Sequence, residues 1–205
     1  MLNVIALPLP PFDTNCYIVS EVNGKKCIII DPASSPEKII NIISARKLSP
    51  VSIVLTHGHF DHIGGADFLR ENYNIPLCIH EADAELLDSP EKNASKHLTF
   101  GEVYIKPADT LLKEGSIIKF GKEKLRIMHT PGHTKGSSVL IGESALFSGD
   151  TLFRDGYGRY DLYGGNMGEL FDSLERLFLL NEYLTVYPGH GEKTTIGDEK
   201  ANERW

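Results

Sequence analysis

Short apolar runs rich in β-branched residues recur along the chain and are separated by turn-forming residues. Runs with these features predict β-strands. The predicted strands lie at 3–8, 15–20, Lys26–Ile30, Val51–Leu55, 77–79, 117–119, 124–129, 138–141, 145–148 and Thr185–Tyr187. Val51–Leu55 is dominated by apolar residues, which is typical of a strand buried on both faces.

Three other segments place apolar residues three or four positions apart, the spacing of one helix face. The first segment begins at 34–37, where Ser, Ser, Pro and Glu supply helix-start chemistry, and the last begins with a capping box formed by Asn166 and Glu169. The apolar positions are Ile39, Ile40 and Ile43 in the first segment, Ile63, Ala66, Leu69 and Tyr73 in the second, and Leu170, Phe171, Leu174, Leu177 and Phe178 in the third.

Strands and helices therefore interleave along the chain, and several predicted strands are close neighbours in sequence. This order indicates a mixed α/β protein built in layers. No linker, low-complexity tract or short repeat divides the sequence, so we expect a single domain over residues 1–205.

Composition narrows the classes of partner. The 205 residues include 21 Lys and Arg against 28 Asp and Glu, a net charge of −7, which argues against binding to nucleic acid or to an anionic membrane. Cys16, Cys27 and Cys78 are odd in number and share no metal-binding spacing, so we expect buried, reduced thiols. With no signal-peptide pattern and no membrane-spanning run, we expect a cytoplasmic protein that acts on a small molecule.

Four segments that follow predicted strands concentrate metal-ligand side chains next to glycine or proline. They are THGHFDH (56–62), HTPGHT (129–134), FSGDT (147–151) and YPGHG (187–191). Glycine and proline permit tight turns, and strand ends hold side chains on a rigid scaffold. The candidate ligands are His57, His59, Asp61, His62, His133, Asp150 and His190.

Seven nitrogen and oxygen donors exceed what one zinc ion takes, and they suit two ions that share one carboxylate. Asp150 stands alone on its loop and is the natural bridge. His80, His97 and His129 lack ligand-type neighbours at suitable spacing, so we interpret these three as structural histidines.

THGHFDH, PGHTKGS, SGDTLF and PGHG, in this order along nearly the whole chain, resemble the metallo-β-lactamase fold superfamily. The resemblance implies an αββα sandwich with two mixed sheets flanked by helices and with the metals at one edge. It implies that one ion is held by His57, His59 and His133, that the other is held by Asp61, His62 and His190, and that Asp150 bridges them. It also implies that Asp31 supports the ligands without binding a metal itself.

The segment 152–166, LFRDGYGRYDLYGGN, is similar to the corresponding stretch of glyoxalase II, the hydroxyacylglutathione hydrolases, and of persulfide dioxygenases. By this resemblance Arg159 and Tyr160 contact the substrate, with the Arg159 guanidinium on a glutathione carboxylate. The alternative is that Arg159 pairs with Asp155 or Asp161 and braces the loop. The chain ends soon after His190, so it resembles the short, single-domain hydrolases that lack a C-terminal helical domain.

The resemblance predicts a metal-dependent hydrolase that cleaves a thioester such as S-D-lactoylglutathione through a hydroxide held between two divalent ions, with Asp61 orienting the nucleophile. Zinc is the first expectation for the metal, and iron and manganese suit the same ligands. The alternative activity is an iron-dependent persulfide dioxygenase, which would use His57, His133 and Asp150 for a single iron. A binding protein without activity is disfavoured because all seven ligands are present.

Overall fold

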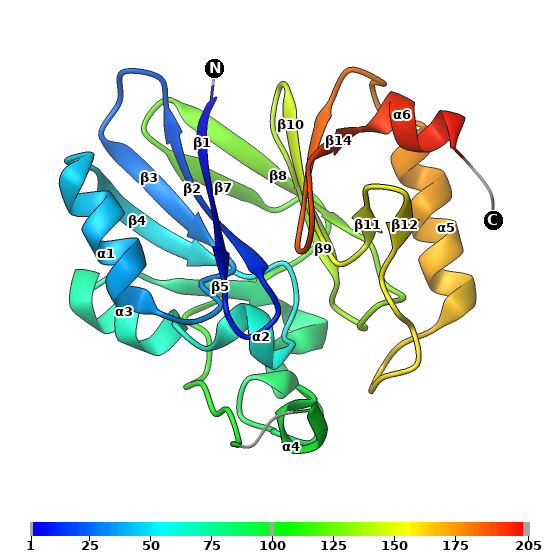
Figure 1. Ribbon diagram of the computed structural model, residues 1–205, viewed down its shortest axis with the longest axis horizontal. Coiled ribbons are helices and arrows are strands. Elements are labelled where there is room, and N and C mark those ends of the chain that lie inside the picture. Colours follow the sequence, from blue (N-terminus) through cyan, green and yellow to red (C-terminus); the bar gives the residue numbers. More distant parts are fainter. Residues whose placement is uncertain (1, 99–100, 203–205) are drawn as a thin grey trace.

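Two six-stranded β-sheets form the centre of the computed structural model, which describes residues 2–98 and 101–202 (Figure 1). The first sheet has the order β1 (Leu2–Leu9), β2 (Thr14–Glu21), β3 (Lys26–Ile30), β4 (Ser49–Val54), β5 (Leu77–His80) and β6 (Thr110–Leu112). The second has the order β14 (Thr194–Thr195), β13 (Thr185–Pro188), β10 (Ala145–Gly149), β9 (Ser138–Ile141), β8 (Glu123–His129) and β7 (Ile117–Phe120). Both sheets mix parallel and antiparallel pairs.

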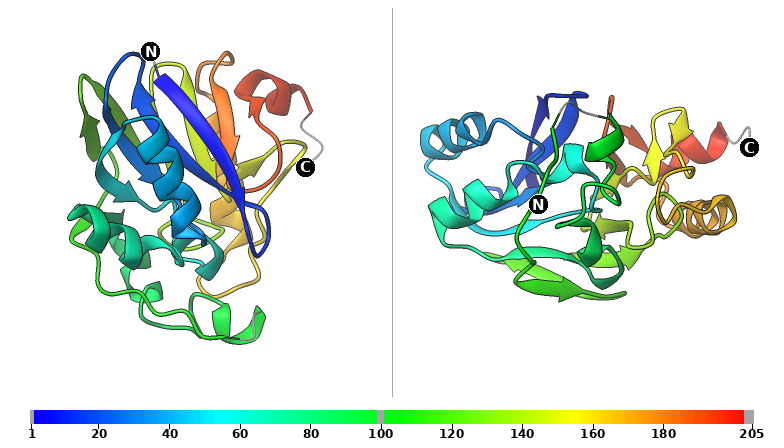
Figure 2. Two further views of the ribbon diagram at one scale, coloured as in Figure 1. Left: turned by 60° about the vertical axis from the view of Figure 1, so that its left-hand side comes forward. Right: turned by 90° about the horizontal axis from the view of Figure 1, so that it is seen from below.

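Helices cover the outer face of each sheet. The longer helices α1 (Pro36–Ala45) and α3 (Ala66–Tyr73) lie against the first sheet, and α5 (Met167–Phe178) and α6 (Ile196–Ala201) lie on the opposite side (Figures 1 and 2). The remaining elements are short: α2 (Phe60–Ile63), the 3₁₀ helix η1 (Glu81–Leu86), α4 (Ser95–Leu98) and the hairpin of β11 (Leu152–Phe153) and β12 (Gly156–Tyr157). This is the αββα arrangement that the resemblance implies.

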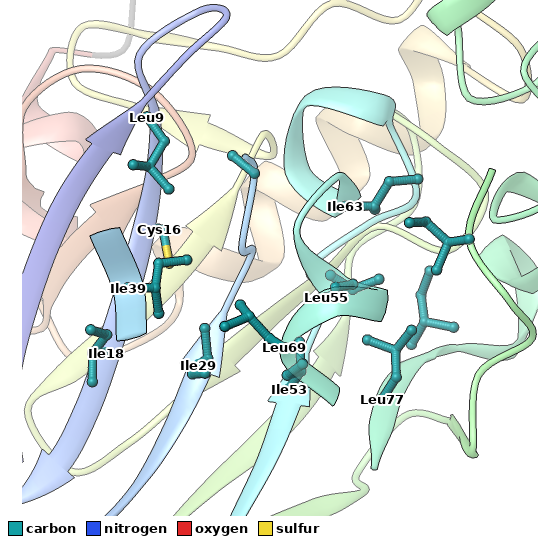
Figure 3. Packing of buried hydrophobic residues seen from close by; sticks show 14 of the residues in the cluster. Leu9, Cys16, Ile18, Ile29, Ile39, Ile53, Leu55, Ile63, Leu69 and Leu77 are labelled. Carbon is teal, nitrogen blue, oxygen red and sulfur yellow. The ribbon is translucent and has the colours of Figure 1, made fainter. Parts of the chain in front are cut away.

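Three buried clusters join these layers. The first joins one face of the first sheet to α1 and α3 and includes Ile39, Ile53 and Leu69 (Figure 3). The second lies between the sheets, and the third packs α5 and α6 on the second sheet. Because sheet residues alternate between two buried faces, these strands are apolar on both sides. No described helix is long and apolar enough to cross a membrane, and all three cysteines are buried and free.

The predicted strands are present, with ends that shift by at most two residues, and the structure adds β6, β11, β12 and β14. The single helix predicted around 63–73 is wrong: two glycines, Gly64 and Gly65, separate α2 from α3. A Cβ atom on Gly64 would lie 2.5 Å from the carbonyl oxygen of Ala33, and one on Gly65 would lie 2.4 Å from that of Pro32. The two glycines thus let the backbone of Pro32 and Ala33, which follow β3, lie close to the backbone between α2 and α3.

Helix starts agree in part with the predictions. The Asn166 side chain accepts a hydrogen bond from the backbone N–H of Glu169, which is one half of the predicted capping box, while the N–H of Asn166 donates to the carbonyl of Gly132 instead. Ser35 lies at the start of α1 with a φ of 50° and makes no side-chain cap, so Pro36 is the residue that begins this helix.

Candidate metal centre

The seven candidate ligands come from four loops that meet at one edge of the sandwich. β4 leads into the loop that carries His57 and His59 and then into α2, while β8, β10 and β13 lead to His133, Asp150 and His190 respectively. Both β8 and β10 are antiparallel to β9, and β10 is parallel to β13. These three strands therefore run in one direction, and their carboxyl ends present the ligands at the same edge of the second sheet.

Three imidazoles converge in what we call the first group, which comprises His57, His59 and His133. Their ligand atoms all lie within 4.8 Å of one another. The Nε2 atom of His133 lies 2.9 Å from Nδ1 of His59 and 3.2 Å from Nε2 of His57. Three nitrogens bound to one zinc at about 2.0–2.1 Å are separated by roughly 3.3 Å when the angles are tetrahedral.

The second group comprises Asp61, His62 and His190. Nε2 of His190 lies 3.2 Å from Oδ2 of Asp61, and Nε2 of His62 lies 3.7 Å from the same oxygen. The hydroxyl of Thr14, in the β1–β2 hairpin, donates a hydrogen bond to this carboxylate at 3.1 Å. One carboxylate and two imidazoles thus face a common point beside the first group.

Asp150 lies between the two groups. Its Oδ1 atom is 3.4 Å from Nε2 of His62, and its Oδ2 atom is 3.6 Å from Nε2 of both His133 and His190. One carboxylate therefore contacts an imidazole of the first group and two of the second, which is the position of a bridging ligand.

Hydrogen bonds on the outer ring nitrogens decide which nitrogens face inward without a proton. Nδ1 of His133 donates to the carbonyl of Arg159 at 2.6 Å, and Nδ1 of His190 donates to that of Phe12 at 3.1 Å. Thr56 uses its hydroxyl proton on Asp31, so this hydroxyl accepts from Nδ1 of His57. When these three histidines are neutral, the Nε2 atom of each therefore carries a lone pair and no proton.

Lone pairs that face each other inside a protein repel unless a cation lies between them. Nε2 of His57 and of His133 are such a pair at 3.2 Å. Nε2 of His62 and Oδ1 of Asp150 are buried, and neither has a hydrogen-bond partner. A divalent ion would satisfy these atoms, so the donors fit a dinuclear metal site on their own chemistry.

Comparison with known proteins agrees with this geometry. The metallo-beta-lactamase superfamily matches residues 9–190. The chain belongs to this superfamily. The probable metallo-hydrolase YqgX of Bacillus subtilis is 38% identical over 197 residues, which cover 95% of this chain and 92% of that protein. The hydroxyacylglutathione hydrolase GloC of Haemophilus influenzae is 33% identical over 206 residues, which cover 98% and 96%.

Solved structures of superfamily members superpose on nearly the whole chain. The BLEG-1 B3 metallo-beta-lactamase has a TM-score of 0.92 at 38% identity and covers 98% of this chain and 97% of its own. The di-iron-bound form of TTHA1623 gives 0.83 at 35% identity, covering 98% and 99%. ETHE1 from Myxococcus xanthus gives 0.79 at 26% identity, covering 98% and 83%. The chain is therefore similar to members with different activities on one metallo-hydrolase scaffold.

Asp31 lies outside the ligand groups and contacts one of their members, His62, directly. It follows β3 with a φ of 48° and accepts hydrogen bonds from the N–H and the hydroxyl of Thr56, at 2.8 and 2.6 Å. Nδ1 of His62 also donates to it, at 3.0 Å. Asp31 thus orients His62 directly and His57 through Thr56.

The two groups differ in electrostatics. Burial lowers the pKa of His59 to about 3, and burial with the neighbouring histidines lowers the pKa of His57. Burial also opposes protonation of His62, but the carboxylates of Asp150 and Asp61 outweigh it and raise the pKa of His62. His57 and His59 therefore stay neutral, whereas carboxylates make the second group attract a cation.

The two carboxylates of the centre ionise easily despite their surroundings. Burial by itself would raise the pKa of Asp150 and of Asp61, but the nearby histidines, His62 foremost and His190 with it, together outweigh burial and lower both. Burial likewise opposes protonation of His190, but a hydrogen bond to Asp61 and the charge of Asp150 together outweigh it and raise the pKa of His190. Protons on the second group consequently compete with a metal ion.

A cavity of about 470 Å³ opens on the ligands, with Asp61 and Asp150 in its wall. Its apolar lining comes from loops far apart in sequence and consists of Phe12, Phe60, Ala94, Leu98, Phe153 and Leu162. Such a cavity admits a small molecule whose reacting group reaches the ligands while its apolar part contacts the walls.

Arg159 also lines this cavity, but its guanidinium is engaged. Its Nε and one terminal nitrogen donate to the two carboxylate oxygens of Asp161, at 2.7 and 2.9 Å. Of the two pairings considered from the sequence, the structure contains the one with Asp161, since Asp155 contacts Arg154 instead. Tyr160 is exposed and is not among the lining residues.

The other histidines lie outside the ligand groups found among the described residues. His80 and His129 stack with ring centroids 4.0 Å apart, and each makes a hydrogen bond to backbone. His97 is exposed on α4. These placements agree with the structural roles expected for them.

Sequence reasoning missed residues that complete the centre from distant segments. Phe12 and Thr14 reach it from the β1–β2 hairpin, and Asp83 reaches it from η1. None of them belongs to a ligand motif, so nothing local in the sequence distinguishes them.

Proposed function

We propose that this chain is a dinuclear metallohydrolase that cleaves a thioester, with S-D-lactoylglutathione as the first substrate to test. The observation that carries the proposal is that two ligand groups share Asp150 beside one cavity. We assign one ion to the first group and the other to the second, with Asp150 as the bridge. Zinc is our first assignment; iron suits the same donors and is present in the similar TTHA1623 structure.

Two divalent ions in these groups would supply a nucleophile from water at neutral pH and positive charge for the oxyanion that develops on the substrate carbonyl. Asp61 stands in the cavity wall, where the Thr14 hydroxyl and His190 hold one of its oxygens. In our proposal this carboxylate orients the attacking water. Outer partners fix the tautomers of four of the five imidazoles, those of His57, His62, His133 and His190, so these ligands need no rearrangement during turnover.

The leaving group explains why thioesters suit this site. A thiol has a pKa of about 8.5, so it can leave as a thiolate without a dedicated general acid. The described cavity lining contains no carboxylate other than Asp61 and Asp150, which are both placed among the ligands. An oxygen or nitrogen leaving group of high pKa would need a proton donor at this point.

Glutathione as the thiol carrier is supported by similarity to GloC and by the position of Arg159 on the cavity wall. The Arg159–Asp161 pair is about half-exposed, and such pairs contribute only about 0–1 kcal/mol. A substrate carboxylate can therefore compete with Asp161 for the guanidinium at little cost. Tyr160 stays a weaker candidate for the same contact. The buried, free cysteines support function in a reducing compartment such as the cytoplasm.

Hydrolysis of S-D-lactoylglutathione tests the proposal, with thiol release followed on protein of measured metal content. We expect turnover that disappears on chelation and returns when metal is added. Thioesters of other thiols, a lactone and a β-lactam serve as parallel substrates. Two bound ions with no hydrolysis of any thioester would contradict the proposed function.

A second candidate is persulfide dioxygenation, favoured by similarity to ETHE1. In that case His57, His133 and Asp150 would hold a single iron. Metal analysis separates the two activities, because the hydrolase requires two ions per chain. One oxygen-sensitive iron together with oxygen consumption on glutathione persulfide would replace the first proposal with the second.

A further inference from the structure

Asp83 is a fully buried carboxylate that lies outside both ligand groups. It belongs to η1, which follows β5 directly, and it accepts three hydrogen bonds. The backbone N–H of Gly58 donates to Oδ2 at 2.9 Å, and the Thr134 hydroxyl donates to the same oxygen at 2.7 Å. The backbone N–H of Gly136 donates to Oδ1 at 2.6 Å.

These three donors lie in the two loops that carry the first group. Gly58 separates His57 from His59, and Thr134 and Gly136 come directly after His133. The loop of Gly58 follows a strand of the first sheet, whereas the loop of Thr134 follows a strand of the second. One carboxylate thus ties together ligand loops from both sheets.

The packing leaves these loops little freedom to move relative to η1. A Cβ atom on Gly136 would lie 2.7 Å from the side chain of Asp83, and one on Gly58 would lie 2.6 Å from Cβ of Leu86. Glycine at both positions therefore allows η1 to contact the loop backbones directly.

His59 has the greatest need for such support. A metal-ligating histidine normally donates its outer ring nitrogen to a fixed acceptor, as His57 and His133 do here. The outer Nε2 of His59 is buried and has no hydrogen-bond partner. The direction of this imidazole must therefore be set through the backbone of His59. The hydrogen bond from Gly58 to Asp83 holds the residue directly before it.

We propose that Asp83 is a positioning residue that sets the metal affinity of the first group by holding the Gly58 and Thr134–Gly136 backbones. This inference rests on the metal centre assumed in the proposed function and concerns only the first of its two ions. Loss of an outer partner typically reduces metal affinity 10- to 100-fold. Asp83 supports two loops at once, so we expect a loss of about this size.

Asp83→Asn tests the inference because it keeps the side-chain shape but turns one acceptor into a donor that faces N–H groups. The measurement is zinc competition against a chromophoric chelator, with elemental analysis of bound metal. We expect one ion per chain to bind at least about tenfold more weakly and the other to bind as in the wild type. Asp88→Asn is the matched control, since Asp88 is an exposed carboxylate in the same segment.

Two backgrounds identify which ion is affected. In a His190→Ala background the remaining tight ion belongs to the first group, and Asp83→Asn should weaken it by the same factor. In a His59→Ala background the remaining ion belongs to the second group, and Asp83→Asn should leave its affinity unchanged. Equal weakening in both backgrounds, or wild-type affinities for both ions in Asp83→Asn, would overturn the proposal.

Thr134→Val provides a milder variant should Asp83→Asn fail to fold, because it removes one of three hydrogen bonds at nearly constant volume. Its expected effect is a smaller loss at the same ion, and Thr134→Ser should restore the affinity. Unchanged affinities in Thr134→Val would likewise contradict the role of Asp83. Wild-type protein that binds two ions but cleaves no thioester would reject the proposed function and leave the inference about Asp83 intact.

Discussion

The two halves of the candidate metal centre are built on different principles. The first group consists of three imidazoles. Thr56 and a backbone carbonyl orient the rings of His57 and His133, and Asp83 holds the backbone between His57 and His59. The second group mixes imidazoles with a carboxylate and lies closer to solvent, with the His190 side chain 26% exposed. We therefore expect geometry to govern cation binding in the first group and charge to govern it in the second.

Asp150→Ala should produce the largest effect because this carboxylate touches both halves. We expect turnover to fall by more than about 100-fold, beyond what loss of an outer partner alone costs, and both ions to bind more weakly. Thiol release and metal content measure these effects, and circular dichroism should show an intact fold. Asp172→Ala, at an exposed carboxylate of α5, is the control. Full activity of Asp150→Ala would refute a shared bridge.

His59→Ala and His190→Ala compare the halves directly. We expect each variant to retain one ion per chain and to lose most thioester hydrolysis, because each removes a ligand from only one group. Elemental analysis of protein dialysed at a fixed free zinc concentration gives the stoichiometry. If both variants lost both ions, the two groups would not be independent sites.

Lowering the pH should release the ions of the two groups one after the other, in a fixed order. The pKa values of His62 and His190 are raised, so these residues take up protons at a higher pH than an ordinary histidine. The pKa of His59 is lowered to about 3, so it stays available as a ligand. Between about pH 8 and pH 5, protons should therefore displace the ion of the second group first. Zinc titrations at several pH values would show the reverse order if this electrostatic contrast is wrong.

Arg159→Ala should have the smallest effect because the guanidinium is half-exposed and already paired with Asp161. We expect KM for S-D-lactoylglutathione to rise by about three- to fivefold, which is on the order of 1 kcal/mol, with little change in kcat. Arg154→Ala provides a matched control, since this exposed arginine lies outside the cavity lining. An unchanged KM in Arg159→Ala would leave Arg159 as a brace of its loop.

Local patterns in the sequence predict a large part of this protein. Strand positions follow from runs such as Lys26–Ile30 and 138–141, which the structure reproduces without any shift. The ligand loops follow from motifs in which glycine or proline adjoins a histidine or aspartate. Such features depend on residues within a few positions of each other, so the periodicity and turn chemistry of the chain reveal them.

Contacts between distant segments decide the rest. The sequence by itself determined the layered α/β class, ten of the fourteen strands that the described residues form and the identity of seven candidate ligands. Only the tertiary structure decided that α2 and α3 separate, that Arg159 pairs with Asp161, and that Asp83 joins two ligand loops. The physical reason is that a buried polar group is satisfied by whichever donor the fold brings to it, and sequence spacing carries no record of that partner.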